Sequence, residues 1–271
     1  TPASLRRLCR QTLPAMIGAT DGRRLMRTTG AIVDTDRWNS FDRFHDTTAT
    51  LVDFYERAGA AVEVTPIQTG GSIGTGRWII QEAQDIRAAT LDVVSPFRER
   101  IADYGKNPWH AVQWTASTPA RGLRCELEVI DRTEQLDRIG PNGLTGRIVL
   151  TSLNILPLME KLAHKGAVGV ITDIEVRNNP TALAWTKFGW GAVPMDHATA
   201  RLVGIVVSHR QGQRLRRQLL QHKRLTLHVR VDTRNYVGHH DVVSGLIQGR
   251  DDPQDEVWAI AHSAEPGAID N

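Results

Sequence analysis

Residues 256–271 read Glu-Val-Trp-Ala-Ile-Ala-His-Ser-Ala-Glu-Pro-Gly-Ala-Ile-Asp-Asn, and this stretch decides the predicted fold. The apolar run 257–261 predicts a strand that delivers His262 at its end. Asp270 follows eight positions later, behind a Pro-Gly turn. An imidazole and a carboxylate are both donors that Zn²⁺ accepts. The stretch therefore suggests two zinc ligands at the junction of a strand and a loop.

The composition is that of a globular protein with a core. Of 271 residues, 41% are hydrophobic and 23% are charged, which suits one large or two ordinary domains. A net charge of +3 is too small to indicate a nucleic-acid partner. No stretch approaches the roughly 18 apolar residues of a membrane span, and no signal peptide is visible, so the compartment stays open.

The two cysteines indicate neither a thiolate zinc site nor a disulfide scaffold. Cys9 and Cys125 lie far apart and in no Cys-x-x-Cys pattern, although one long-range disulfide stays open.

The first half of the chain mixes helices with strands. Residues 1–30 are expected to be helical, and this segment could pack on the body or on a partner subunit, which leaves a homo-oligomer open. A helix over 40–60 and a strand over 61–67 predict an α/β layer. Residues 78–94 suggest a strand, a short helical link and another strand, and 123–130 alternate as a half-buried strand.

After Asp131 the pattern of predicted secondary structure changes to that of a β-rich module with short helices. Strands are expected at 147–151, 167–172, 204–208 and 225–231, and helices at 157–164 and 211–220. Two further strands are expected at 241–249 and 256–261, and there the pattern of the first half of the chain resumes.

Three segments together resemble a known family. The runs 241–249, 255–262 and 266–271 resemble the first metal-binding segment of co-catalytic di-zinc aminopeptidases of the aminopeptidase Y and bacterial leucyl aminopeptidase type. Residues 133–232 resemble the protease-associated domain inserted in such enzymes, notably at 146–150 and 165–171. The resemblance implies an incomplete zinc-exopeptidase-like α/β sandwich with a mixed sheet. Its peptidase parts would be 1–132 and 233–271, interrupted by the β-rich module at 133–232.

The resemblance also implies roles for four residues. His262 would bind one zinc, Asp270 would bridge two zinc ions, and Asn271 would support the backbone of Asp270. Where relatives have an Asp that orients the histidine, this chain has Ala264, and Glu265 is the nearest acid. The general-base glutamate is expected downstream, so no catalytic residue is assigned within this chain, which is expected to be inactive alone.

Structural roles are expected for several other motifs. The glycine-rich run 70–76 lacks the features of a phosphate loop. His239 and His240 with Asp241 could bind a metal, but the two histidines are expected to be a surface pair, since neighbours on a strand point to opposite faces. Structural or solvated roles are also expected for Asp196 and His197, for Ser208 and His209, and for the basic residues Arg214, Arg216, Arg217, His222, Lys223 and Arg224.

The sequence thus predicts a zinc-dependent exopeptidase, an aminopeptidase whose partner is a peptide substrate. The alternative is a non-catalytic module, derived from such a peptidase, that binds a peptide or a protein.

Overall fold

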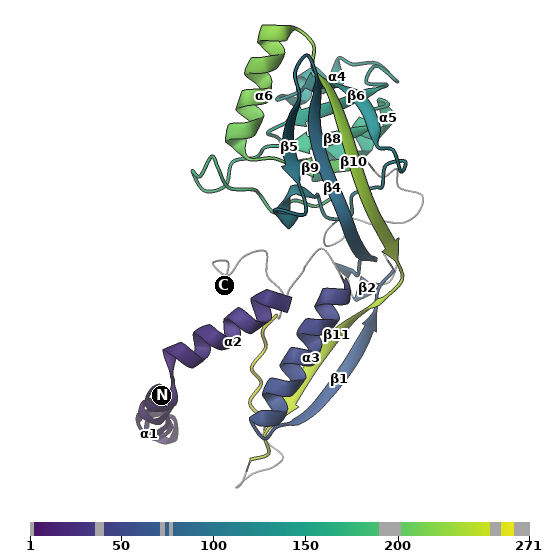
Figure 1. Ribbon diagram of the computed structural model, residues 1–271. Helices are drawn as coiled ribbons and strands as arrows, with labels where there is room; N and C mark the ends of the chain where they lie inside the picture. The colour runs from purple at the N-terminus through teal and green to yellow at the C-terminus, as the bar shows by residue number, and fades with distance from the viewer. Residues whose placement is uncertain are drawn as a thin grey trace. The chain divides into compact units, whose positions relative to one another are not determined.

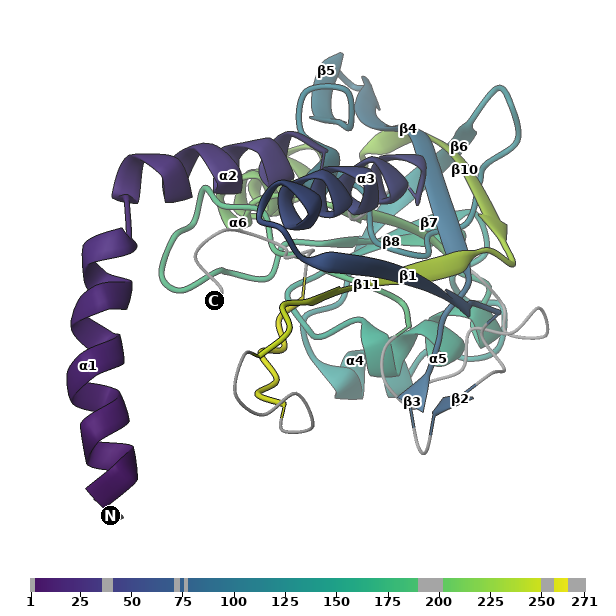
Figure 2. The ribbon, with the colours of Figure 1, turned by 90° about the horizontal axis from the view of Figure 1, so that it is seen from below.

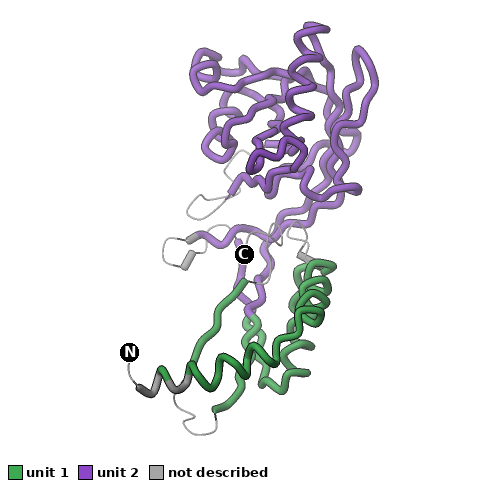
Figure 3. The backbone as a smooth tube through the Cα atoms, turned by 90° about the vertical axis from the view of Figure 1, so that its left-hand side faces the viewer, with its two compact units in different colours: residues 1–38, 42–65, 243–271 green, residues 39–41, 66–242 purple. Residues whose placement is uncertain are grey.

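The computed structural model describes residues 3–35, 41–70, 74–75, 78–189, 202–249 and 256–262. The chain divides into two compact units, coloured separately in Figure 3. Unit 1 comprises residues 1–38, 42–65 and 243–271, and unit 2 comprises residues 39–41 and 66–242.

Unit 1 is mainly helical. It contains α1 (Ala3–Ala19), α2 (Gly22–Thr35) and α3 (Phe41–Arg57). The helices predicted for residues 1–30 and 40–60 are therefore confirmed. Met16, Ile17 and Met26 are at least 60% exposed. The helix α3 leads through Gly59, at a φ of +79°, into β1 (Ala61–Gln68). The strand β1 pairs with β11 (His239–Leu246), as Figure 1 shows.

Unit 2 is built on a seven-stranded mixed sheet. Its order is β5 (Glu99–Asp103), β4 (Ala83–Ser95), β10 (Thr226–Tyr236), β6 (Leu123–Val129), β7 (Arg147–Thr151), β8 (Gly169–Thr172) and β9 (Val203–Val206). The strands β6 to β9 run parallel, whereas β10 is antiparallel to both β4 and β6, and β5 is antiparallel to β4. The predicted mixed α/β class is therefore confirmed. The sheet includes strands outside 133–232; the predicted boundaries of that module stay a prediction.

One strand in the sheet corrects the prediction for residues 78–94. A two-residue strand β3 (Trp78–Ile79) pairs with β2 (Gly74–Thr75), but no helical link follows it. Instead β4 is a single strand of 13 residues that pairs with β10 along most of its length. Its buried apolar residues alternate from Ala89 through Leu91 to Val93, all fully buried, as in a half-buried strand.

Helices cover both faces of the parallel strands. Successive side chains of β7 point to opposite faces, so Ile148 and Leu150 join one apolar cluster and Val149 the other. The first cluster includes Leu215 of α6 (His209–His222). The second includes residues of α4 (Thr133–Asp137), η2 (Leu156–Leu158) and α5 (Met159–His164). Figure 2 shows α6 on one side of the sheet and α4 and α5 on the other.

The strand predicted for 256–261 is wrong. Residues 256–262 have no regular secondary structure, and Val257 and Ile260 are 101% and 89% exposed. A strand needs a neighbour to satisfy its backbone groups, and no described strand pairs with this segment.

The described residues answer the question of a disulfide, which the sequence left open. Cys9 and Cys125 are both free, so no disulfide joins them. Among the helices of the described ranges, none has the length and apolarity required to cross a membrane.

Candidate functional site

Of the four residues assigned to the zinc site, the structure describes one. His262 is exposed, at the end of the irregular segment 256–262. Glu265, Asp270 and Asn271 lie outside the described residues. One imidazole does not make a zinc site, because structural zinc takes four ligands and catalytic zinc three from the protein. The roles predicted for these four residues stay predictions.

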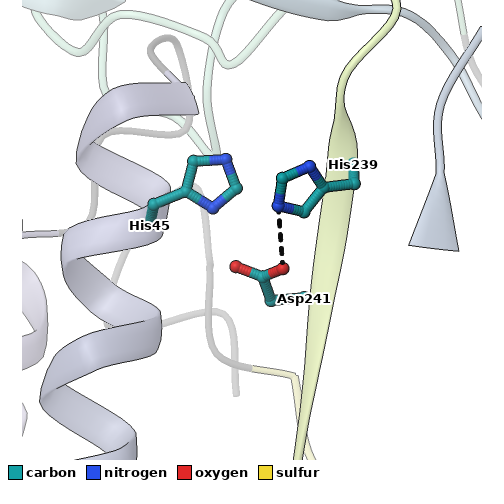
Figure 4. A group of neighbouring side chains, drawn as sticks. All are labelled: His45, His239 and Asp241. Carbon is teal, nitrogen blue, oxygen red and sulfur yellow. Dashed lines mark ion pairs between the residues drawn. The ribbon is translucent and has the colours of Figure 1, made fainter. Parts of the chain in front are cut away.

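A histidine–carboxylate pair lies elsewhere, at the start of β11. His239 Nε2 is 3.3 Å from Asp241 Oδ1, and the side chain of Asp241 is 8% exposed. Figure 4 draws this pair; the third labelled residue, His45, stands on α3 and belongs to unit 1. The two residues of the pair are two positions apart and therefore project from the same face of the strand. Imidazole nitrogen and carboxylate oxygen are zinc donors, but two donors leave a zinc site incomplete.

The sequence analysis considered His239 and His240 with Asp241 and set the group aside because it compared His239 with its neighbour His240. Adjacent residues do point apart, but the informative spacing is the one between His239 and Asp241. The signal was the i, i+2 spacing of a histidine and an acid where the predicted strand 241–249 begins, although β11 itself begins at His239.

A second polar group lies in unit 2, where the parallel strands end. Asp131 comes two residues after β6, Ser152 directly after β7 and Asp173 directly after β8. The carboxyl ends of adjacent parallel strands meet at one edge of a sheet, so these side chains gather there. Ser152 Oγ donates to Asp173 Oδ1 at 2.9 Å, and Ser152 N donates to Asp131 Oδ1 at 3.2 Å.

Arg216 of α6 joins the two carboxylates. Its Nε donates to Asp131 Oδ2 at 2.9 Å, and its Nη1 donates to Asp173 Oδ2 at 2.5 Å. Asp173 is fully buried, and the Arg216 side chain is 13% exposed. Burial opposes ionisation of both Asp131 and Arg216. The hydrogen bonds and charges between the partners outweigh it, so the pKa of Asp131 is lowered and the pKa of Arg216 is raised.

Local features of α6 bring Arg216 to this position. Ser208 caps the helix: Gln211 N donates to Ser208 Oγ at 3.3 Å, and Ser208 N donates to Gln211 Oε1 at 2.8 Å. At Gly212 an added Cβ would stand 2.0 Å from Asp173 Oδ2, so only glycine lets the helix approach the strand end this closely. His209 Nδ1 lies 3.1 Å from the Asp173 carbonyl oxygen.

The group formed by Asp131, Ser152, Asp173 and Arg216 is an ion-pair network rather than a metal centre. The guanidinium bonds both carboxylates and fills the place that a cation would take between them. The prediction that Arg216 lies on a solvated helix face is therefore wrong. The sequence signal for this network was three short polar side chains, each following an apolar strand.

Two other basic residues of this group form ion pairs. Arg214 pairs with Glu99 at 2.6 Å, and Arg224 pairs with Glu126. Asp196 and His197 lie in a part of the chain that the structure does not describe.

A seven-stranded mixed sheet with helices on both faces defines a mixed α/β fold, and solved peptidases share it. One is the crystal structure of a peptidase M28 precursor from Shewanella amazonensis SB2B, at a TM-score of 0.61 and 13% identity, covering 83% of this chain and 50% of that chain. Another is an aminopeptidase from Aneurinibacillus sp. strain AM-1, at a TM-score of 0.52 and 16% identity, covering 88% of this chain and 50% of that chain.

These likenesses establish the fold, which is that of part of an M28 peptidase structure. This chain spans about half the length of the solved structures it matches. No protein-family model and no curated protein matches the sequence.

Proposed function

We propose that this chain forms part of a zinc-dependent exopeptidase, an aminopeptidase that removes N-terminal residues from peptides. The observation that carries the proposal is an agreement between two independent signals. The fold is like that of a peptidase M28 precursor and of an aminopeptidase. The sequence around His262 and Asp270 resembles the first metal-binding segment of the aminopeptidase Y and leucyl aminopeptidase type.

In the proposed site, four residues of this chain and further residues of a longer protein would together bind zinc and carry out hydrolysis. His262 and Asp270 would hold zinc, and Glu265 and Asn271 would support these ligands through hydrogen bonds. Zinc bound there would polarise the scissile carbonyl and activate a water for attack. The longer protein would supply the remaining ligands and the general-base glutamate. The module at 133–232, proposed to be protease-associated, would shape access for a peptide.

The test compares zinc content and hydrolysis of an aminoacyl p-nitroanilide. Both are measured on this chain and on a version extended to the length of the solved peptidases. We expect two zinc ions per chain and hydrolysis in the extended protein alone. In that protein His262→Ala and Asp270→Asn should each lower the zinc content and abolish hydrolysis.

The matched control is His164→Ala, which removes an exposed histidine of α5 with no proposed metal role. It should leave both measurements unchanged. An extended protein that folds but binds no zinc and hydrolyses no anilide would refute the proposal. That result would favour the non-catalytic binding module instead.

A further inference from the structure

A polar cavity opens in unit 2 at the end of the sheet where β6 and β10 begin and β4 ends. Its volume is about 650 Å³, within the range of ligand sites. Its lining includes Arg124 and Glu126 of β6, Arg224 and Thr226 beside the start of β10, and His222 at the end of α6. Two guanidinium groups and one carboxylate leave the charged lining with a net positive charge.

Arg124 is the residue that points to a ligand. Its side chain is exposed, and its guanidinium makes no hydrogen bond or ion pair with any residue in the described part of the chain. A guanidinium presents its donors in a planar fork that matches a carboxylate with two parallel hydrogen bonds. Arg124, which lines the cavity, therefore offers a carboxylate-binding group that the fold itself does not use.

The second arginine of the cavity, Arg224, forms an ion pair that a ligand can compete with. Arg224 pairs with Glu126, but the two side chains are 72% and 37% exposed. Exposed ion pairs are weak because water competes for both charges. A ligand carboxylate could therefore share Arg224 with Glu126. The charge of Glu126 also disfavours a doubly charged anion such as phosphate more than a singly charged carboxylate.

The backbone beside Arg124 is open on one side. In β6, residues 123–126 pair with β10, whereas pairing with β7 begins only at Glu126, opposite Arg147. Among the described strands, none lies on the β7 side of residues 123–125. Such an edge can accept an extended peptide by main-chain hydrogen bonds. The edge and Arg124 line the same cavity.

We infer that this cavity binds an extended peptide segment that carries a carboxylate, with Arg124 as the residue that recognises the carboxylate. Neither the proposed zinc ligands nor the proposed hydrolysis enters this inference. The carboxylate could come from an acidic side chain or from a peptide C-terminus.

The test is isothermal titration of the full 271-residue chain with three N-acetylated tetrapeptides. The first is C-terminally amidated and has one glutamate side chain. The second is neutral in its side chains and has a free C-terminal carboxylate. The third is amidated and neutral throughout, and inorganic phosphate serves as a fourth probe. We expect at least one of the first two peptides to bind at least tenfold more tightly than the neutral peptide and than phosphate; whichever binds identifies the source of the carboxylate.

Variants assign the binding to Arg124. Arg124→Gln should weaken the carboxylate peptide at least tenfold, and its folding is checked by circular dichroism. Arg230→Gln is the matched control, because Arg230 is an exposed arginine of β10 that does not line the cavity. It should bind as the unchanged chain does. Equal binding of the neutral peptide or of phosphate, no binding of any peptide, or an equal loss in both variants would overturn the inference.

Discussion

The Nη1 atom of Arg216 lies 2.5 Å from Oδ2 of Asp173, whose side chain is fully buried. This pair links α6 to the carboxyl end of β8, and Asp131 extends it to the end of β6. Buried charges are tolerated only when they are paired and hydrogen-bonded, and both conditions hold for this pair. The network therefore fixes α6 on the sheet. Its removal should lower the free energy of unfolding.

The first prediction concerns Arg216→Met. This change keeps most of the side-chain volume but leaves Asp173 buried without its cation. Breaking a buried pair in this way costs about 3–5 kcal/mol. We expect the free energy of unfolding, measured by urea denaturation, to fall by that amount.

The control for this prediction is Arg217→Met, at the next position of α6. Arg217 is exposed, and surface changes of this kind stay within about 0.5 kcal/mol. Similar losses for the two variants would contradict the assigned role of Arg216.

The second prediction concerns pH. Arg216 holds the pKa of Asp131 below its usual range, despite the opposing effect of burial. A carboxylate with a lowered folded pKa contributes stability above its unfolded pKa of about 3.9, and that contribution is lost as the pH falls through the folded value. We expect Asp131→Asn to unfold more easily than the unchanged chain at pH 7, with a difference that shrinks below about pH 4.

The pH dependence is measured by denaturant titrations between pH 7 and the acid limit of folding. A stability difference that stays constant over this range would show that the carboxylate charge of Asp131 contributes nothing, and that the loss arises from packing alone.

The third prediction concerns the close approach of α6 to β8. In Gly212→Ala the added methyl group would overlap the side chain of Asp173, with its nearest atom 2.0 Å away. Overpacking of this kind typically costs about 1–3 kcal/mol, even though alanine is the better helix former. Thermal unfolding should show the loss.

Gly140→Ala is the comparison within the same unit, because a methyl group added there meets no atom within 4 Å. We expect it to change stability by no more than about 0.5 kcal/mol. If Gly212→Ala were equally harmless, the helix would have to sit farther from the strand end than the structure shows.

The sequence predicted most helices and strands because their apolar periods are local. The parallel strands and α6 follow from runs such as 147–151 and from leucines at helical spacing, and all of them form. The segment 256–261 shows the limit of that reasoning. Its apolar run has strand character, but a strand exists only beside a partner, and pairing is not a local property.

The candidate sites were harder to predict because they depend on contacts between distant residues. Arg216 is separated from Asp131 by 85 residues and from Asp173 by 43, so nothing near it in the sequence marks it as buried. The His239–Asp241 pair, by contrast, was within reach of the strand period. The roles of His262 and Asp270 came from a family resemblance and stay predictions.

The last prediction concerns the two thiols. Cys9 is exposed, whereas Cys125 is 3% exposed, and burial raises the pKa of its thiol to about 12. The thiolate is the reactive form, so Cys125 should be inert in the folded chain at about pH 8. We expect a chromogenic disulfide reagent to titrate one thiol per native chain and two in denaturant. Cys9→Ser should abolish the native reaction, and Cys125→Ser should leave it unchanged. A second thiol reacting as fast as the first under native conditions would contradict the burial of Cys125 in β6.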